Sequence, residues 1–539
     1  MLLSGDNSHW MKRFLSFTTR IFLHRSSPYF PKHSPLILLG VILLFAYFYD
    51  YQHIITFRPQ GVHQWRQCDC LSMTSNFYSG DADFLHPRIY NLLNDNEGRT
   101  ASDFPLIYYL VSLLWKVFGK HEWIFRLVNF LISSIAMLAL LRIFESMLKD
   151  SFWSLFSVSL LFTSGIFVYY SLNFLMNTTA FSFALIGWYF FFRFYHGGKP
   201  WQLYLMFLFF LLGGLLKTSS LISFLALSAL FVFDWLGLVP RNGDLRIFDN
   251  RLSFIIPSIL LAACIILWIR YVSAYNHQWN SGVFLVGILP IWDLSSGQIR
   301  EVLDHVFVRW INGYFFWPAQ VFFVLAAGVA WIFWKRAEKS LLLLTGFMMI
   351  GFAGFVILFF AALKNHDYYM IDQLILSVFI MLTFFTLLLN NRKQRAVIDL
   401  TFIKVLAVAF LIVNMSHTRK EIDGRYGAVG NIQKNEMYGY LDIEPCLESL
   451  GIDASSKVIS ASDRTINVSL YLMNRKGWSR YGTNMEDSTA VAKRISEGAE
   501  YLLYHQDIDP ENNSHWKYFI KEKLGVHQNV TICRIGTPE

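Results

Sequence analysis

The sequence predicts a polytopic α-helical membrane protein that carries a smaller α/β domain at its carboxyl end. Of its 539 residues, 54% are hydrophobic and only 16% are charged, which is more apolar surface than a soluble domain buries. Long apolar runs recur through the first 415 residues, and the composition then turns polar. Basic residues gather between alternate runs, as they do in proteins that thread a membrane many times.

Eleven apolar runs are long enough, or nearly so, to cross a membrane as helices. About 20 apolar residues are needed, and a helix pairs its own backbone groups where no water is available. The first run lacks a small-residue cleavage site, so we expect it to remain as the first helix. We predict about 11 transmembrane helices within 35–415, after an amino-terminal segment at 1–34. Their cores lie at 35–50, 123–144, 152–170, 175–195, 201–216, 219–238, 253–273, 318–334, 341–363, 368–389 and 400–415.

The charges of the loops predict the orientation, because Lys and Arg accumulate on the cytoplasmic side of a membrane. The amino terminus and every loop on its side are basic, and an odd number of helices then places the carboxyl terminus outside. This pattern explains most of the net charge of +8, so we expect no nucleic-acid partner. The basic residues are Lys12, Arg13, Arg20, Arg25 and Lys32; Arg142 and Lys149; Arg193 and Lys199; Arg241, Arg246 and Arg251; Lys335, Arg336 and Lys339; and Arg392, Lys393 and Arg395.

Three regions are predicted on the outer side. The first loop, 51–122, contains the apolar stretch FPLIYYLVSLLWKVFG at 104–119, for which we expect a helix in the membrane interface. A second outer loop, 274–317, ends in an aromatic stretch typical of a membrane boundary. Residues 416–539 are expected to form the α/β domain. Within it, KVISAS, TINVSLYLM, AEYLLYH and NVTICRI are predicted as strands, and AVAKRISEGA and HWKYFIKEKLG as helices.

Titratable side chains gather in the first outer loop. Arg66 and Asp69 lie in GVHQWRQCDCL at 61–71, and Asp103 precedes Phe104-Pro105. A carboxylate in an aqueous loop is ordinarily only solvated. Asp103 also suits a helix amino-terminal cap. We therefore leave open whether these carboxylates are only solvated or capping groups, or take part in the function.

Three further polar positions lie at predicted outer helix ends. Lys217, in GGLLKTSS, either contacts a phosphate or extends its amine to the membrane surface. His366, Asp367 and Tyr368 either cap a helix or contact a substrate. Neither His366-Asp367 nor Cys68-x-Cys70 has the ligand spacing of a metal site. We predict no metal site, and a divalent ion is left open, as is pairing of Cys446 with Cys533.

The combination WRQCD at 65–69, SDFPLIYYLVSLLWKVFGKHEWIFRL at 102–127, many helices and an outer polar tail resembles the lipid-dependent glycosyltransferases of the GT-C fold. It is similar to bacterial members of glycosyltransferase family 39, which includes protein O-mannosyltransferases and the aminoarabinose transferase acting on lipid A. The resemblance covers the helical region to about residue 390 and is strongest from 61 to 130.

This resemblance implies a fold, an activity and a set of site residues. The activity is inverting transfer of a sugar from a polyprenyl-phosphate carrier to an acceptor hydroxyl on the outer face of the bacterial inner membrane, with the α/β domain in the periplasm. Asp69 matches the family's essential first-loop carboxylate, the expected general base. Asp103 matches a second acidic position. Asn177 stands where relatives often have Asp, so only a hydrogen-bonding role is expected there.

Transfer of a sugar from a polyprenyl phosphate requires a base and cations. A sugar phosphodiester already carries a good leaving group, so the demanding steps are deprotonation of the acceptor and stabilisation of charge at the departing phosphate. Arg66 suits phosphate oxygens through its planar fork, and Lys217 is the second candidate. We expect His366, Asp367, Tyr368 and Asn177 to position the substrates. The partners are the polyprenyl-phosphate-linked sugar, a glycan, lipid or protein acceptor, and the membrane lipids.

Two other classes of function stay open. A transporter or flippase of lipid-linked saccharides would explain the hydrophobicity, but we find no internal repeat and few charges within the helices. A catalytically inactive GT-C-like scaffold would accommodate Asn177. The carboxyl-terminal tail has no G-x-G-x-x-G motif, so we expect it to contact the acceptor, to close over the site, or to serve as structure alone.

Overall fold

The computed structural model describes residues 29–239, 248, 250–284, 287–427, 437–505 and 514–537. The predicted segment 1–34 falls mostly outside these residues, as do Arg241 and Arg246 of the basic loops. The helical part consists of α2 (Ser34–Phe48), α3 (Tyr51–Ile54), α4 (Gln64–Ser79), α5 (Leu106–Phe118), α6 (Glu122–Leu148), α7 (Ser151–Leu161), α8 (Gly165–Ser171), α9 (Asn177–Tyr195), α10 (Trp201–Leu216), η1 (Thr218–Leu221), α11 (Ile222–Trp235), α12 (Leu252–Gln278), η2 (Ile291–Asp293), α13 (Ser296–His305), η3 (Val306–Trp310), α14 (Ile311–Tyr314), α15 (Trp317–Ile332), α16 (Lys339–Leu358), η4 (Phe360–Lys364), η5 (Asp367–Met370), α17 (Leu374–Asn390), α18 (Arg392–Ile398) and α19 (Thr401–Tyr426).

Each of the eleven predicted apolar runs lies on a helix, but fewer helices meet the length and composition expected of a full span. Within the described residues six helices do, or up to eight if each of two bent pairs is one span. The bent pairs are α7 with α8, and α13–α14 with α15. The count falls below eleven because α2 and α10 have only 15 and 16 residues, and α9 carries Asn177 and Arg193 near its ends.

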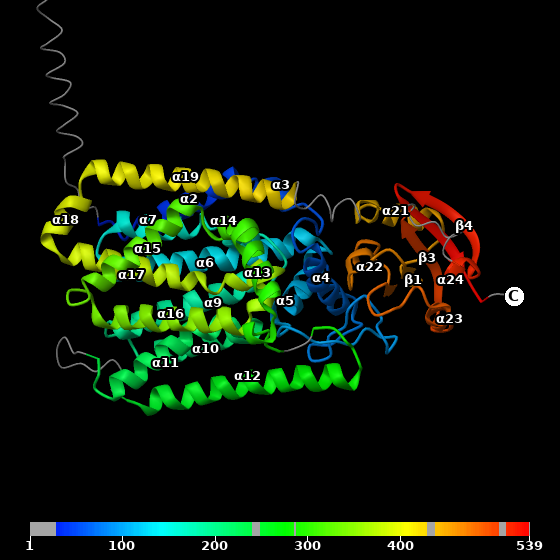
Figure 1. Ribbon diagram of the computed structural model, residues 1–539, viewed down its shortest axis with the longest axis horizontal. Helices are drawn as coiled ribbons and strands as arrows, with labels where there is room; N and C mark the ends of the chain where they lie inside the picture. The colour runs from blue at the N-terminus through cyan, green and yellow to red at the C-terminus, as the bar shows by residue number, and fades with distance from the viewer. Residues whose placement is uncertain are drawn as a thin grey trace, which may run out of the picture.

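The long helices lie along one axis of the molecule, with the C-terminal sheet beyond one end and α18 at the other (Figure 1). The apolar windows of α12 and α19 are only 17% buried, whereas that of α17 is 83% buried. Figure 1 shows α12 and α19 on opposite sides of the bundle and α17 between them. Apolar side chains therefore cover the flanks of the bundle, as expected where lipid is the solvent.

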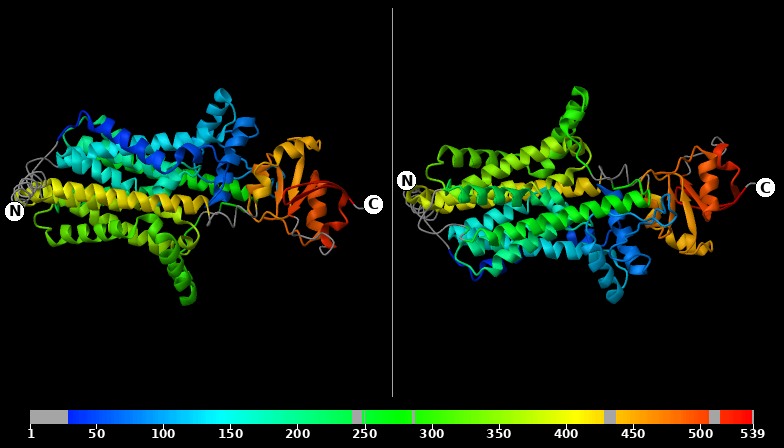
Figure 2. Two further views of the ribbon diagram at one scale, coloured as in Figure 1. Left: turned by 90° about the horizontal axis from the view of Figure 1, so that it is seen from above. Right: turned by 90° about the horizontal axis from the view of Figure 1, so that it is seen from below.

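Two helices lie across the bundle axis near its sheet end (Figure 2). One is α5, which confirms a helix within the predicted stretch 104–119. Its Tyr108 and Trp115 are buried against the bundle, while Val117 and Phe118 are exposed. The other is α13, whose first turn is closed by a capping box between Ser295 and Gln298.

The C-terminal α/β domain has one five-stranded sheet in the order β2-β1-β3-β5-β4. The strands β2, β1 and β3 are parallel, whereas β3, β5 and β4 are antiparallel. The predictions of β1, β3, β5 and α23 are confirmed. The elements are α21 (Glu444–Ser449), β1 (Lys457–Ser460), α22 (Val468–Leu472), β2 (Gly477–Ser479), α23 (Ser488–Ser496), β3 (Ala499–His505), α24 (Ser514–Lys517), β4 (Ile520–His527) and β5 (Val530–Ile535).

Two predictions in this domain are wrong. TINVSLYLM was expected to be a strand, but its centre is helix α22, because the side chains of Asp463 and Thr465 accept hydrogen bonds from backbone N–H groups at the start of this helix. HWKYFIKEKLG was expected to be a helix, but most of it is strand β4, which pairs with β5. Tertiary pairing overrides local helix preference there. Cys446 and Cys533, whose pairing the sequence left open, are free thiols.

Candidate functional site

A cavity of about 830 Å³ lies where the sheet end of the bundle meets the C-terminal domain. One part of its wall is apolar and comes mainly from α12 and the end of α16. The other part is polar and comes from α4, the loop before α5, the α10–η1 junction, η5 and the loop before α22. The apolar part includes Ile265, Trp268, Ile269, Val272, Phe355 and Phe359, and the polar part includes Arg66, Ser102, Asp103, Asn177, Lys217, His366, Tyr368, Tyr369, Arg464 and Tyr481.

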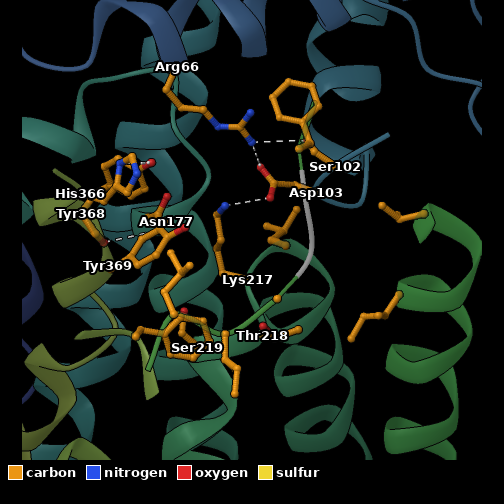
Figure 3. Close-up of a pocket in the computed structure, with 18 of the residues that line it drawn as sticks. Arg66, Ser102, Asp103, Asn177, Lys217, Thr218, Ser219, His366, Tyr368 and Tyr369 are labelled. Atoms are coloured by element: carbon orange, nitrogen blue, oxygen red, sulfur yellow. Dashed lines mark hydrogen bonds and ion pairs between the residues drawn. The ribbon is translucent and has the colours of Figure 1, made fainter. Parts of the chain in front are cut away.

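Asp103 is the centre of an ion cluster in this wall (Figure 3). Arg66 Nη2 donates to its Oδ2 at 2.7 Å, and Lys217 Nζ donates to its Oδ1 at 2.8 Å. Tyr108 Oη adds a third hydrogen bond at 3.0 Å. Burial favours the protonated carboxyl, but Lys217 and Arg66 outweigh it, so that the pKa of Asp103 is lowered. The carboxylate is therefore ionised and holds two cations at the cavity.

The positions of these residues follow from local structure. Arg66 lies in the first turn of α4. Asp103 lies just ahead of α5, where Pro105 precedes the first helical residue. Lys217 ends α10 in an extended conformation, with φ of −149°, so the chain turns into η1 and the amine faces the loop of Asp103. The sequence analysis expected Arg66, Asp103 and Lys217 at the site, and the structure brings all three together.

Asp69 lies one helical turn after Arg66, yet it does not line the cavity. Its exposed fraction is 0%, and its Oδ1 accepts a hydrogen bond from Asn467 Nδ2 at 2.7 Å. Its Oδ2 lies 3.7 Å from Arg66 Nη1 and accepts no hydrogen bond within the described chain. Burial raises the pKa of Asp69 to about 6. The role expected for Asp69, direct deprotonation of an acceptor, conflicts with this enclosed position.

His366, Tyr368 and Asn177 border the cavity on the side facing Asp103 and Lys217 (Figure 3). His366 Nδ1 lies 3.1 Å from Tyr368 Oη, and Asn177 Nδ2 donates to the Tyr368 carbonyl at 3.4 Å. Burial, and next the neighbouring His63, lowers the pKa of His366 to about 4. These three residues were expected to position substrate, and the structure places all three where they can touch one.

Asp367 does not line the cavity and is fully buried. It accepts from Tyr170 Oη at 2.6 Å, bonds to His63 Nε2 at 2.9 Å and pairs with Arg425 Nη2 at 2.7 Å. Asp367 therefore lies among protein groups outside the cavity lining, and its expected contact with a substrate stays an untested prediction. Its three partners come from α8, the start of α4 and the end of α19, and the carboxylate ties these elements together.

The C-terminal domain contributes a loop that the sequence analysis missed. Arg464, Thr465 and Ile466 line the cavity, together with Tyr481 after β2. The loop is held by Asp463, whose carboxylate accepts from the backbone N–H and hydroxyl of both Thr465 and Ser469 at 2.6–2.8 Å. Arg464 is exposed and makes no ion pair with any described residue. The sequence analysis predicted a strand, TINVSLYLM, that begins within this loop, and the loop was therefore overlooked. The Asp463-x-Thr465 pattern was the available signal for it.

A metal site would need a cluster of acidic, histidine or cysteine ligands. In the described residues, no group of three or more such side chains is placed to hold a metal ion.

Comparison with known proteins places the fold. The family model of dolichyl-phosphate-mannose-protein mannosyltransferases matches residues 102–268, which is less than half of the chain. Among curated proteins, no sequence matches.

Solved structures match over nearly the whole length. ArnT from Cupriavidus metallidurans in the apo state gives a TM-score of 0.61 at 12% identity, over 94% of this chain and 99% of that chain. The same protein bound to undecaprenyl phosphate gives 0.57 at 12% identity, with the same coverage. The archaeal oligosaccharyltransferase AglB from Archaeoglobus fulgidus, in complex with an inhibitory peptide and a dolichol-phosphate, gives 0.52 at 11% identity, over 88% and 70%. The predicted GT-C fold is confirmed.

Proposed function

We propose that this protein is a membrane glycosyltransferase that transfers a sugar from a polyprenyl-phosphate carrier to an acceptor hydroxyl. The observation that carries the proposal is the division of the cavity wall into two parts. Arg66 and Lys217 lie at the polar part, while α12 and α16 supply an apolar part that includes Trp268 and Phe355. A ligand with a phosphate head and a long hydrocarbon chain combines the same two properties. A fold neighbour, ArnT, was solved with such a ligand, undecaprenyl phosphate.

The charge of the cavity supports the same ligand class. Arg66, Lys217 and Arg464 carry three positive charges against the one negative charge of Asp103, a net of +2 with His366 neutral. Departure of a polyprenyl phosphate develops negative charge on its oxygens, and fixed cations at that place lower the barrier. We assign the phosphate to Arg66 and Lys217 because Asp103 orders both before the ligand binds.

In this proposal the two carboxylates of the first outer loop, Asp103 and Asp69, have different roles. Asp103 orients the two cations toward the phosphate. Asp69 supports Arg66 from the buried side of α4 and connects this helix to Asn467 of the C-terminal domain. We propose that the reaction inverts the anomeric centre by direct displacement, with the acceptor entering from the side of the cavity that faces the phosphate.

The location follows from the basic loops. The basic helix α18 lies at the end of the bundle opposite the C-terminal sheet (Figure 1). Since basic loops remain in the cytoplasm, we propose that the cavity and the C-terminal domain lie on the outer face of a bacterial inner membrane. Arg464 and Tyr481 then face the acceptor, which is a glycan, a lipid or a protein.

The test is transfer by the purified protein in lipid nanodiscs. Radiolabelled sugar is supplied on a panel of synthetic polyprenyl phosphates carrying different hexoses and pentoses, with extracted envelope glycolipids and glycans as acceptors. Binding of undecaprenyl phosphate is measured in parallel. We expect Arg66→Gln and Lys217→Gln each to weaken that binding at least 10-fold, because each removes a charge-assisted phosphate contact.

A matched control is Arg300→Gln, which removes an exposed arginine of α13 that does not line the cavity. It should bind undecaprenyl phosphate as the wild type does. The proposal is overturned if the wild type binds no polyprenyl phosphate and turns over no donor of the panel.

A further inference from the structure

Transfer to a hydroxyl needs a group that accepts the proton of the acceptor, and such a base must lie within reach of the reacting atoms. Among the described residues that line the cavity, two side chains, Asp103 and His366, are in a deprotonated form at neutral pH that could act as a base. Asp69 and Asp367 are fully buried and do not line it. The choice of base therefore lies between a carboxylate and an imidazole.

Asp103 is unsuited to this role because its oxygens are already engaged. Two cations and a tyrosine hydroxyl donate to them at 2.7–3.0 Å, and the cations lower the pKa of the carboxyl. Protonation would weaken both ion pairs at the moment when Arg66 and Lys217 are needed by the departing phosphate. Its lone pairs serve the cations, and they are not available to an incoming hydroxyl.

The pKa of His366 is lowered as well, but His366 differs from Asp103 in that only one of its two ring nitrogens is engaged by a described residue. Its ring lies 5.4 Å from that of Tyr368, 5.4 Å from that of Tyr369 and 5.6 Å from that of Trp65, so aromatic neighbours confine it. Nδ1 is 3.1 Å from Tyr368 Oη. When this nitrogen donates to the tyrosine oxygen, Nε2 carries the lone pair and has no hydrogen-bond partner in the described chain. The ring borders the cavity on the side facing Lys217 and Asp103 (Figure 3).

This arrangement suits a displacement with inversion, in which nucleophile and leaving group lie on opposite faces of the anomeric carbon. With the phosphate at Arg66 and Lys217, the acceptor hydroxyl enters from the side of His366. We propose that His366 is the general base of the transfer, an assignment that rests on the function proposed above.

The step balances as a single displacement. The acceptor oxygen forms a bond to the anomeric carbon, and its proton passes to His366 Nε2. The bond between that carbon and the phosphate oxygen breaks, and its electron pair leaves with the polyprenyl phosphate. The imidazolium formed then loses its proton to water. Tyr368, by accepting from Nδ1–H, stabilises the charged ring as it forms.

The groups around His366 set its pH dependence. His63, Lys217 and Arg66 oppose a positive charge on the ring and Asp367 favours one, while burial is the largest influence and lowers the pKa to about 4. Tyr368 and Tyr369 face it as neutral hydroxyls. The ring is consequently a neutral base through the range above about pH 5, and transfer is expected to fall only as the pH drops toward 4.

The experiment compares the wild type with His366→Gln, His366→Ala and the control His86→Gln. His86 is an exposed histidine of the first loop that is bonded to Asp83 and does not line the cavity. Folding is checked by size-exclusion chromatography. Three quantities are measured in the nanodisc assay, namely undecaprenyl phosphate binding, kcat against pH, and the recovery of kcat on addition of imidazole.

We expect His366→Gln to lower kcat by about 10²–10⁴-fold, the usual contribution of a general base, with undecaprenyl phosphate binding within 3-fold of the wild type. His366→Ala should recover part of its kcat with added imidazole, a response that a structural role would not produce. If His366→Gln transfers sugar as fast as the wild type, His366 is not the general base, but the proposed glycosyltransferase activity still holds. Parallel loss of binding and transfer, without imidazole recovery in His366→Ala, overturns it as well. A wild type that neither binds undecaprenyl phosphate nor transfers sugar overturns the proposed function itself.

Discussion

Two ion clusters near the same end of the bundle are chemically alike and differ in what their cations face. In each, one carboxylate is bound by two basic groups and one tyrosine hydroxyl. Asp103 has Arg66, Lys217 and Tyr108 as partners, whereas Asp367 has Arg425, His63 and Tyr170.

The surroundings of a charge cluster decide what it can do. The cations of Asp103 border a cavity of about 830 Å³, so their remaining donors are available to an anion. Arg425 and His63 are buried, as Arg66 is, but they do not line this cavity. A fixed cation pair at a cavity can bind a ligand, while the same pair inside the fold holds elements together at the cost of desolvation.

The largest effect is expected from Asp367→Asn. It leaves Arg425 buried without a counter-ion, and removal of one partner of a buried pair costs about 3–5 kcal/mol. The midpoint of thermal unfolding in detergent should fall sharply, and the yield of monodisperse protein should fall with it. A midpoint equal to that of the wild type would contradict the structural role of this cluster.

Asp103→Asn should affect function more than stability, because its cations are close to the cavity and water can replace part of the lost charge. Arg66 and Lys217 would lose their fixed orientation toward the phosphate. We expect transfer to fall by about 10²-fold or more and undecaprenyl phosphate binding to change as well. Retention of full transfer would show that Asp103 does not order the cations.

Asp69→Asn separates a positioning role from a catalytic one. Since Asp69 does not reach the cavity, we expect kcat to fall by less than about 10-fold, against the 10²–10⁴-fold loss of a general base. Abolished transfer in a folded Asp69→Asn protein would restore Asp69 as the base.

The same variant carries a pH prediction. Burial raises the pKa of Asp69 from 3.8 to about 6, so the folded state binds more protons than the unfolded state between these values. Stability from this group is present below about pH 4 and is lost as the pH rises through 6, by roughly 3 kcal/mol. The unfolding midpoint of Asp69→Asn should therefore rise relative to that of the wild type between pH 4 and 7. Parallel pH curves for the two proteins would contradict this linkage.

The smallest effect is expected from Arg464→Gln in the C-terminal domain. Its exposed guanidinium lines the cavity. If Arg464 contacts the acceptor, as proposed, the KM for an acceptor should rise by about 5-fold in Arg464→Gln, with undecaprenyl phosphate binding unchanged. Arg480→Gln, which removes a cation paired with Glu486 on the same domain, is the control. Equal KM values in all three proteins would leave the domain with a structural role alone.

Much of the fold could be predicted because hydropathy and loop charge are local properties. All eleven apolar runs are largely helical, although 152–170 is divided between α7 and α8. The stretches WRQ, DFP and GGLLKTSS contain three of the four members of the Asp103 cluster. The errors arose where contacts distant in sequence decided the outcome. Strand β4 exists because β5 pairs with it, and α22 begins at a loop organised by Asp463.

By itself, then, the sequence determined the membrane class, the order of the helices and the presence of cations and carboxylates at one end of them. Only the tertiary structure decided which carboxylate lines the cavity. Asp69 is enclosed by Asn467, which lies 398 residues away, and Asp103 meets a lysine 114 residues away. Exposure is a property of the packed chain, because a side chain is buried by residues that are brought together only when the helices and the C-terminal domain assemble.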